Sequence, residues 1–358
     1  MKRASFRYKA PYAGLAAAVA LAMAPGILPA TNADAAPASS SAPLQCRTYI
    51  FKVKQFATDI VKQSVWGQFC FRGQVTSDTP VQILIHGGAY NHTYWDSPFQ
   101  PDRYSYVQAA TKRGYATLNI DRLGYGQSDR PVAATLDFNV AGYVTHQLVQ
   151  MLRDGSVGIR FTRVILNGHS MGALTAENEA ANYRDVDGVI VTGIGHNLSP
   201  PPEQLTTFVP AATDPKFVGQ LSAASYLTSR PNVRISVFVE GGSYDPAIVP
   251  YEEGILKDTL SPTEFTALPM DTSDQTQLTQ KITAPVLFAQ GRYDKIWCTR
   301  TFDCTTDPQA LKESSYWNTS FTRIVIPNAG HSINSNLSAP TFYDATFTWL
   351  EQHGLAPR

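Results

Sequence analysis

The sequence lacks a long apolar run and any cluster of charge. Its apolar run near the N-terminus, residues 13–23, covers 11 residues, whereas a helix needs roughly 20 to cross a bilayer. We therefore expect no integral membrane segment after processing. Charged residues make up 16% of the chain, with 29 basic and 29 acidic groups, and Lys and Arg are scattered along it. This distribution excludes a large basic surface, so we expect neither nucleic acid nor an anionic membrane as a partner.

The first 35 residues have the features of an export signal. A basic start is followed by the apolar run and by Ala33-Asp34-Ala35, a small-x-small cleavage site. No adjacent pair of arginines is present there, which favours general secretion over export of a folded protein. We predict a signal peptide over residues 1–35, a flexible mature N-terminus over residues 36–45, and a secreted, extracellular protein.

Removal of this signal leaves a chain of ordinary size and charge. The mature chain would have 323 of the 358 residues, enough for one large α/β domain with an insertion. The signal carries four of the 29 basic residues and one of the 29 acidic ones, so 25 basic and 28 acidic groups remain. The mature net charge is therefore near −3.

Cysteine is scarce, and the four present fall in two local pairs. Loop closure costs least entropy for near neighbours, and export places cysteines where disulfides persist. Of the three connectivities that four cysteines allow, we predict the bridges Cys46–Cys70 and Cys298–Cys304. A zinc site is the alternative, but no His lies within a few residues of either pair at ligand spacing.

Apolar runs that alternate with helical patterns predict the fold class. Continuous apolar strands separated by helices are typical of a mostly parallel, doubly wound sheet that is covered on both faces. We predict about eight strands, over residues 48–53, 66–72, 81–85, 115–120, 163–167, 186–193, 284–290 and 321–326, with the first two antiparallel. The predicted helices cover residues 104–113, 139–154, 173–183 and 339–353.

This rhythm breaks between the sixth and seventh predicted strands. Residues 197–281 are rich in proline and contain short helical patterns and one extended segment, residues 233–240. An insertion at this place is typical of a lid over an active site. We predict an α/β core over residues 46–196 and 282–358, with a cap over residues 197–281.

A Gly-x-Ser-x-Gly pentapeptide, Gly168-His169-Ser170-Met171-Gly172, lies between a predicted strand and a predicted helix. This pattern is typical of a nucleophile elbow, a strained turn that lifts the serine hydroxyl above the sheet, and glycine permits the close approach because it has no Cβ. The pentapeptide arises by chance in roughly 10% of chains this long. Its interpretation therefore depends on the rest of the sequence.

A serine hydroxyl needs a base, and the base needs an orienting acid. Asp294 follows the next-to-last strand and His331 follows the last, so both fall at the same edge of the sheet as Ser170. Asp245 is the alternative acid, since it also follows an extended stretch. The sequence His-Gly-Gly, residues 86–88, ends another strand, where a glycine N–H can turn toward substrate and form an oxyanion hole.

Several further residues near these loops have two interpretations. Three aromatic side chains are either walls of a substrate pocket or packing residues on the sheet: Tyr90, Trp95 and Trp297. The remaining polar candidates we interpret as structural: His86, His146 and His169 as packing residues, and Asp121 and Arg122 as anchors of the turn over residues 121–131.

Together these motifs resemble those of the α/β-hydrolase superfamily with a cap domain. The resemblance covers about residues 80–352 and rests on residues 86–88, 121–129, 168–172, 291–294 and 330–331. The cysteine pair after the acid is similar to that of secreted serine hydrolases of actinobacteria and fungi. The resemblance implies that the catalytic groups are the nucleophile Ser170, the general base His331, the orienting acid Asp294 and, as oxyanion hole, the N–H groups of Gly88 and Met171.

The implied reaction is hydrolysis of a carboxylic ester through an acyl-enzyme, without cofactor or metal, by a monomer that acts on an external lipid, plant or polymer ester. The same fold and triad also serve peptidases, lactonases, haloperoxidases and hydroxynitrile lyases. An aminopeptidase would need a carboxylate cluster, for which the candidates are Glu252, Glu253 and Asp258. Epoxide hydrolases and haloalkane dehalogenases of this fold use Asp as nucleophile, and Ser170 argues against both. A non-catalytic binding module is the alternative from another class, although no triad residue is missing.

Overall fold

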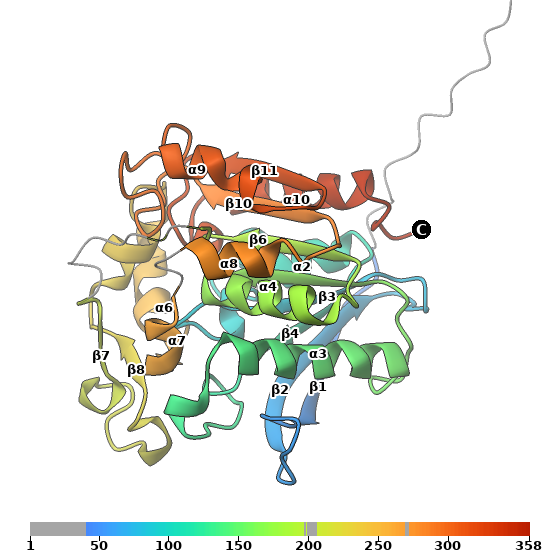
Figure 1. Cartoon of the computed structure of the whole chain (residues 1–358), viewed down its shortest axis with the longest axis horizontal. Coiled ribbons are helices and arrows are strands. Elements are labelled where there is room, and N and C mark those ends of the chain that lie inside the picture. The colour runs from blue at the N-terminus through green and yellow to red at the C-terminus, as the bar shows by residue number, and fades with distance from the viewer. Residues whose placement is uncertain (1–40, 197, 199–205, 269–271) are drawn as a thin grey trace, which may run out of the picture. The chain divides into compact units, whose positions relative to one another are not determined.

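A computed structural model describes residues 41–358 apart from 197, 199–205 and 269–271 (Figure 1). The predicted signal peptide, residues 1–35, lies outside the described residues. None of the described helices combines the length and apolar character that spanning a bilayer requires.

The main sheet has eight strands in the order β1-β2-β4-β3-β5-β6-β10-β11. Strand β1 (Leu44–Val53) is antiparallel to β2 (Gln63–Arg72), and β2 is antiparallel to β4. All other neighbours are parallel, which confirms the predicted fold class. These strands are β3 (Val81–Ile85), β4 (Ala116–Ile120), β5 (Val164–His169), β6 (Gly188–Thr192), β10 (Val286–Gly291) and β11 (Phe321–Ile326).

Helices cover both faces of this sheet because its central strands are apolar on both sides. In β3, Ile83 and Ile85 pack into one core cluster, and Leu84 between them packs into the other. One face carries α3 (Phe138–Asp154), α4 (Met171–Tyr183) and α8 (Thr272–Thr279), which lie side by side in Figure 1. The other carries α1 (Pro101–Tyr104), α2 (Tyr106–Lys112) and α10 (Ala339–Gln352). A single helix was predicted over residues 104–113; it is divided at Ser105, whose hydroxyl caps α2.

Both predicted disulfides are formed. Cys46 and Cys70 face each other across β1 and β2 with Cα atoms 4.1 Å apart. Cys298 and Cys304 close a short loop after β10, with Cα atoms 5.2 Å apart. Because β1 begins at Leu44, residues 44 and 45 pair with β2 and do not belong to the flexible N-terminus in which we had placed them.

Between β6 and β10 the chain leaves the main sheet and forms a second one. This sheet is antiparallel and consists of β7 (Phe208–Pro210), β8 (Leu227–Ser229) and β9 (Thr259–Leu260). Short helices accompany it, α6 (Val249–Glu253) and α7 (Pro262–Thr266), and α9 (Pro308–Lys312) follows β10. Single 3-10 turns lie at His92–Tyr94, Ala133–Thr135, Ala211–Thr213, Leu221–Ala223, Pro246–Ile248, Glu313–Tyr316 and Ile333–Ser335.

The extended segment predicted over residues 233–240 was wrong. Ile235–Val239 forms a turn of π-helix, in which Glu240 N–H donates to Ile235 O at 2.7 Å. Alternating β-branched residues suggested a strand, but the most deeply buried side chains of residues 233–240 are Arg234, Phe238 and Val239. Successive side chains of a strand point to opposite faces, so the burial of the neighbours Phe238 and Val239 in one core cluster does not fit a strand.

We expect the two disulfides to contribute unequally to stability. Cys46–Cys70 spans 24 residues and Cys298–Cys304 spans 6, and the chain-entropy model then gives contributions of about 3.5 and about 2 kcal/mol. Replacing each pair by alanines and measuring urea unfolding of both variants tests this. A larger loss from the short loop would show that packing of that loop outweighs chain entropy.

Candidate active site

Ser170 lies in a strained turn between β5 and α4, with φ 52° and ψ −121°. Its N–H donates to Thr192 O at 2.7 Å, and its carbonyl accepts from Ala173 N at 2.8 Å. A Cβ on Gly172 would lie 2.2 Å from Ile85 O, and one on Gly168 would lie 2.3 Å from Gly172 O. Both positions therefore require glycine, and the backbone has the strand–turn–helix form expected for the pentapeptide.

The Ser170 side chain opens into a cavity at the carboxyl edge of the parallel strands. His331, Gly88 and Met171 line the same cavity, so the structure brings these four predicted residues together. The rest of the described wall is mostly apolar and consists of Tyr90, His169, Ile194, Leu198, Phe208, Phe238, Leu268 and Ile296. Five of these come from the segment between β6 and β10: Ile194, Leu198, Phe208, Phe238 and Leu268.

Asp294 and His331 form a buried hydrogen-bonded pair. His331 Nδ1 lies 3.0 Å from Asp294 Oδ2, and Asp294 Oδ1 accepts from the N–H groups of Ile296 (2.9 Å) and Trp297 (3.1 Å). Because a carboxylate can only accept, Nδ1 carries the proton and Nε2 keeps its lone pair. Within the described part of the chain, no hydrogen bond joins His331 to Ser170 Oγ, although both line one cavity.

The alternative acid, Asp245, has other partners. Its Oδ1 accepts from Ala247 N at 2.9 Å and its Oδ2 from Gln100 Nε2 at 2.9 Å. Asp245 therefore caps a turn in the segment between β6 and β10. The carboxylate that contacts His331 is that of Asp294.

His86 orients the glycine loop after β3. Arg122 N–H donates to His86 Nε2 at 3.1 Å, so the ring proton is on Nδ1 and donates to Gly87 O at 2.8 Å. In a trans peptide the carbonyl and the next N–H point in opposite directions, so Gly88 N–H points away from His86. A Cβ on Gly88 would lie 2.4 Å from Met171 Sδ, which places this loop against the start of α4.

We had interpreted His86 as a packing residue, but its two hydrogen bonds also orient the glycine loop. Burial, followed by the charge of Arg122, lowers its pKa to about 3. The ring stays neutral near pH 7, as its two hydrogen bonds require. His169 does fit the packing interpretation, since its ring stacks on Tyr94 at 4.4 Å and its Nδ1 lies 3.0 Å from Thr192 Oγ1.

Of the three predicted pocket aromatics, the described cavity wall includes Tyr90 alone. Trp95 is fully buried between Tyr94 and Tyr106, with ring centroids 5.1 and 5.4 Å away. Trp297 packs on Phe288 and donates its indole N–H to a backbone carbonyl at 3.1 Å. The contacts of both tryptophans fit the packing interpretation, and neither is among the described residues that line the Ser170 cavity.

A buried ion pair, Arg234 with Glu252, joins the segment between β6 and β10 to the glycine loop. Arg234 Nε and Nη2 donate to Glu252 Oε2 at 3.1 and 3.0 Å. Its Nη1 donates to Ala89 O at 2.8 Å, next to Gly88, and its guanidinium lies 4.0 Å above the Tyr90 ring. Because Ala89 has φ 56°, this bond helps to hold a backbone conformation that is uncommon for alanine.

The same ion pair reaches the loop that carries His331. Tyr90 OH donates to Glu252 Oε2 at 3.0 Å and lies 2.8 Å from the hydroxyl of Ser332, the residue after His331. Ser335 Oγ donates to the other carboxylate oxygen, Glu252 Oε1. One carboxylate thus connects three loops around the cavity. Sequence reasoning considered Glu252 for amine binding and missed this role, because Ser335 and Tyr90 lie 83 and 162 residues from it.

These contacts bear on the aminopeptidase hypothesis, which relied on three carboxylates. Glu252 is buried in the ion pair, and Glu253 accepts from Arg234 N at 3.1 Å. Asp258 lies 3.1 Å from Arg130 Nη2 and 3.0 Å from Asn91 Nδ2. None of the three is among the described residues that line the Ser170 cavity.

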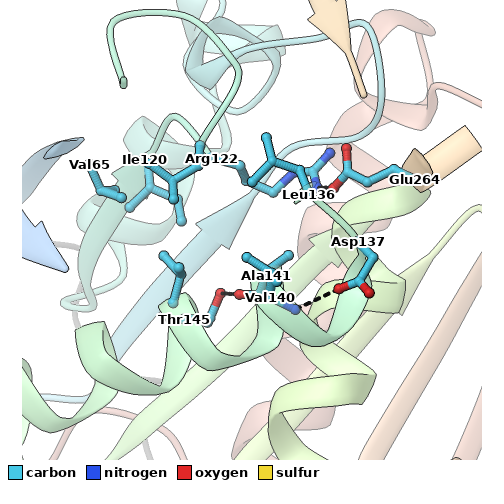
Figure 2. A pocket seen from close by; sticks show the side chains of 11 residues that line it. Val65, Ile120, Arg122, Leu136, Asp137, Val140, Ala141, Thr145 and Glu264 are labelled. Carbon is cyan, nitrogen blue, oxygen red and sulfur yellow. Dashed lines mark hydrogen bonds and ion pairs between the residues drawn. The ribbon is translucent and has the colours of Figure 1, made fainter. Parts of the chain in front are cut away.

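A second cavity lies between α3 and the sheet (Figure 2). At its rim Arg122 forms an ion pair with Glu264 of α7, and Tyr125 OH donates to Glu264 Oε2 at 2.6 Å. Asp137 in this wall caps α3 by accepting from Val140 N at 2.8 Å. The contacts of Glu264 hold α7 against the turn over residues 121–131.

The predicted anchor role of Asp121 and Arg122 is confirmed by their contacts. Asp121 Oδ1 accepts from His92 N at 2.7 Å, and its Oδ2 accepts from Gln127 N at 2.8 Å. Arg122 ties the same turn to α7 through Glu264.

Residues 82–345 match the model of the alpha/beta hydrolase family. Since this match covers most of the chain, the protein belongs to the alpha/beta hydrolase family. It is a hydrolase of that family, with the fold and the edge-of-sheet cavity described above.

Solved structures of similar fold include two ester hydrolases. A monoacylglycerol lipase of Paleococcus ferrophilus has a TM-score of 0.53 and 19% identity, over 77% of this chain and 96% of that one. A thermophilic esterase from Thermogutta terrifontis has a TM-score of 0.54 and 18% identity, over 85% of this chain and 99% of that one. Identities this low show the fold alone.

A curated relative, Epoxide hydrolase 3 of Xenopus tropicalis, is 32% identical over 118 residues, which is 33% of this chain and 28% of that protein. An uncharacterized protein of Mycobacterium tuberculosis is 30% identical over 123 residues, or 34% of this chain and 31% of its own length. The chain therefore matches less than a third of the length of these relatives, and their activities do not transfer to it as findings.

We expect Glu252→Gln to lower the free energy of unfolding by about 3–5 kcal/mol, because it leaves the buried Arg234 guanidinium without a counter-charge. Glu253→Gln is the matched control: Glu253 is 17% exposed, and glutamine keeps the oxygen that accepts from Arg234 N. That control should cost less than about 1 kcal/mol. Urea unfolding measures both, and equal losses would contradict a special role for Glu252.

The low pKa of His86 predicts a pH dependence of stability. Below pH 6.5 the unfolded chain takes up a proton on His86 that the folded chain does not, until the folded group titrates at about 3. In this window wild type should lose about 1.4 kcal/mol per pH unit relative to His86→Gln. Unfolding of both proteins between pH 7 and pH 4 tests this, and a difference that stays constant would show that folded His86 accepts a proton near neutral pH.

Proposed function

We propose that the protein is a secreted serine hydrolase that cleaves carboxylic esters through an acyl-enzyme, with Ser170, His331 and Asp294 as its triad. The observation that carries this proposal is the buried Asp294–His331 pair, whose histidine lines the same cavity as a serine in a strained strand-to-helix turn. The two disulfides support secretion, because such bonds persist outside the cytosol.

In the first step, Ser170 Oγ attacks the ester carbonyl while His331 Nε2 takes the hydroxyl proton. Asp294 stabilises the imidazolium that forms, and its own orientation is held by two backbone N–H groups. The hydrogen bond between Ser170 and His331 that this step needs is often long or misaligned in the absence of substrate and tightens in the complex.

The tetrahedral intermediate places a negative oxygen beside the start of α4. The N–H groups of Gly88 and Met171 are the proposed donors to it, each contributing about 3–4 kcal/mol to transition-state stabilisation. His331 then protonates the leaving alcohol, and a water molecule deprotonated by His331 releases the acid from Ser170.

The walls of the cavity support an apolar ester as substrate. Phe208, Phe238 and Ile296 contribute aromatic and aliphatic surface, which suits the acyl or alcohol chain of a lipid or polymer ester. Because two of these residues come from the segment over residues 197–281, we assign that segment the role of a cap. A peptidase or a lactonase on the same triad is the second candidate. The carboxylates that an aminopeptidase would use to hold a substrate amine are engaged within the chain: Glu252, Glu253 and Asp258.

We expect Ser170→Ala to lower ester turnover by several orders of magnitude and to leave the melting temperature nearly unchanged, because the triad loses its nucleophile and the fold does not depend on the hydroxyl. The assay is a panel of p-nitrophenyl esters of rising chain length with an aminoacyl anilide, together with fluorophosphonate labelling. Absence of labelling in the folded wild type would indicate a binding module, and faster turnover of the anilide would indicate a peptidase.

A matched pair of variants tests the acid. Asp294→Asn should lower kcat strongly, because it removes the charge that stabilises protonated His331. Asp245→Asn should leave kcat close to that of wild type. The reverse order would reassign the acid to Asp245.

A further inference from the structure

Three side chains with metal-ligand groups meet between α3 and α4, away from the cavity. They are His146 of α3, Glu179 of α4 and Asp185, which follows α4, and one ligand atom of each lies within 4.8 Å of the others. His146 Nδ1 lies 2.9 Å from Asp185 Oδ2 and 3.7 Å from Glu179 Oε1. At 1.5 Å per residue, Glu179 lies roughly 13 Å along the helix from Ser170.

Glu179 is a buried carboxylate that lies beside a second carboxylate, Asp185, and the ring of His146. Its exposed fraction is 0%, and neither of its oxygens has a hydrogen-bond partner among the described residues. No Lys or Arg of the described chain forms an ion pair with it. A buried anionic oxygen is costly unless a cation or donor meets it.

His146 presents a nitrogen to the two carboxylates. Its ring stacks on Tyr183 at 3.8 Å with an interplanar angle of 11°, which fixes the ring plane. Within the described residues Nδ1 has no hydrogen-bond partner, although it lies 2.9 Å from Asp185 Oδ2. Asp185 Oδ1 is also buried and unpaired there. Several polar atoms with ligand character thus lie close together between α3 and α4.

One imidazole nitrogen and two carboxylate oxygens are a donor set that suits zinc. Calcium and magnesium prefer oxygen ligands throughout. We propose that His146, Glu179 and Asp185 bind one Zn²⁺ ion, with water as the fourth ligand. His146 and Asp185 have side chains 23% and 19% exposed, which leaves a route for the ion and its water. Gln150 Nε2 donates to Asp185 Oδ2 and orients that ligand from outside the site.

The site would fasten α3 to α4, the helix that begins at Ser170. Its role is structural, since the ligands lie away from the cavity and the proposed reaction needs no metal. If zinc binds the folded chain and not the unfolded chain, the free energy of unfolding rises with the logarithm of the zinc concentration.

The test is a zinc titration of the untagged, EDTA-treated chain by calorimetry, paired with thermal unfolding. We expect one Zn²⁺ per chain and, at a hundredfold excess over Kd, a rise in Tm of about 5 °C. Two variants each remove one ligand: His146→Phe keeps the stacking on Tyr183, and Glu179→Gln keeps the side-chain shape. Each should weaken zinc binding by about 100-fold or more, beyond the usual effect of an outer-shell partner.

Glu177→Gln is the matched control, because Glu177 is equally buried on the same helix but contacts Gln275 instead. It should bind zinc as wild type does. Absence of zinc binding by wild type would overturn the proposal, and so would binding that both ligand variants retain. Wild type that binds no zinc, with Glu179→Gln more stable than wild type, would instead show a proton shared between Glu179 and Asp185. Because heat and Tm are measured, the result does not depend on ester turnover.

Discussion

The close contact between the start of α4 and the end of β3 determines the geometry of the cavity. Gly172 lies against the carbonyls of Ile85 and His86, so α4 begins directly beside the loop that contains Gly88. This contact brings the backbone of Met171 next to Gly88 and places Ser170 at the carboxyl edge of the sheet. The unfavourable φ of Ser170 is offset by its hydrogen bond to Thr192 and by those that start α4.

Around this contact, buried polar groups hold the loops that lie outside the sheet's own hydrogen bonds. His86 holds the Gly87 carbonyl, Asp294 holds the His331 ring, and Arg234 holds the Ala89 carbonyl. In each case the polar group is buried and hydrogen-bonded. Its replacement therefore costs stability, and its hydrogen bonds specify the geometry of the loop. The segment between β6 and β10 therefore supplies part of the cavity wall and also orients the loops beneath it.

Much of the core could be predicted from sequence because it depends on local patterns. The strand patterns over residues 81–85 and 321–326 predicted β3 and β11 to the residue, and the spacing of the cysteines predicted both disulfides. Local patterns failed where burial depended on distant partners. Residues 233–240 alternate like a strand, yet the pairing of Arg234 with Glu252 favours a helical turn.

The pocket and the cluster at His146 could not be predicted for the same reason. Trp95 and Trp297 lie beside cavity loops in sequence, but their side chains point into the core. The wall residues Phe208 and Phe238 come from the segment between β6 and β10, and no local pattern indicates that they pack against the cavity. His146 and Glu179 are brought together by the packing of α3 on α4, which no spacing in the sequence encodes.

The surroundings of Gly172 also limit how this protein can change over evolutionary time or in a laboratory library. A side chain there would strike main-chain oxygens, which are present whatever residues occupy positions 85 and 86. At Gly67, by contrast, the nearest atoms belong to the side chains of Phe51 and Leu118, and smaller residues at those positions would make room. Compensating substitutions can therefore release Gly67 from being glycine, whereas none can release Gly172.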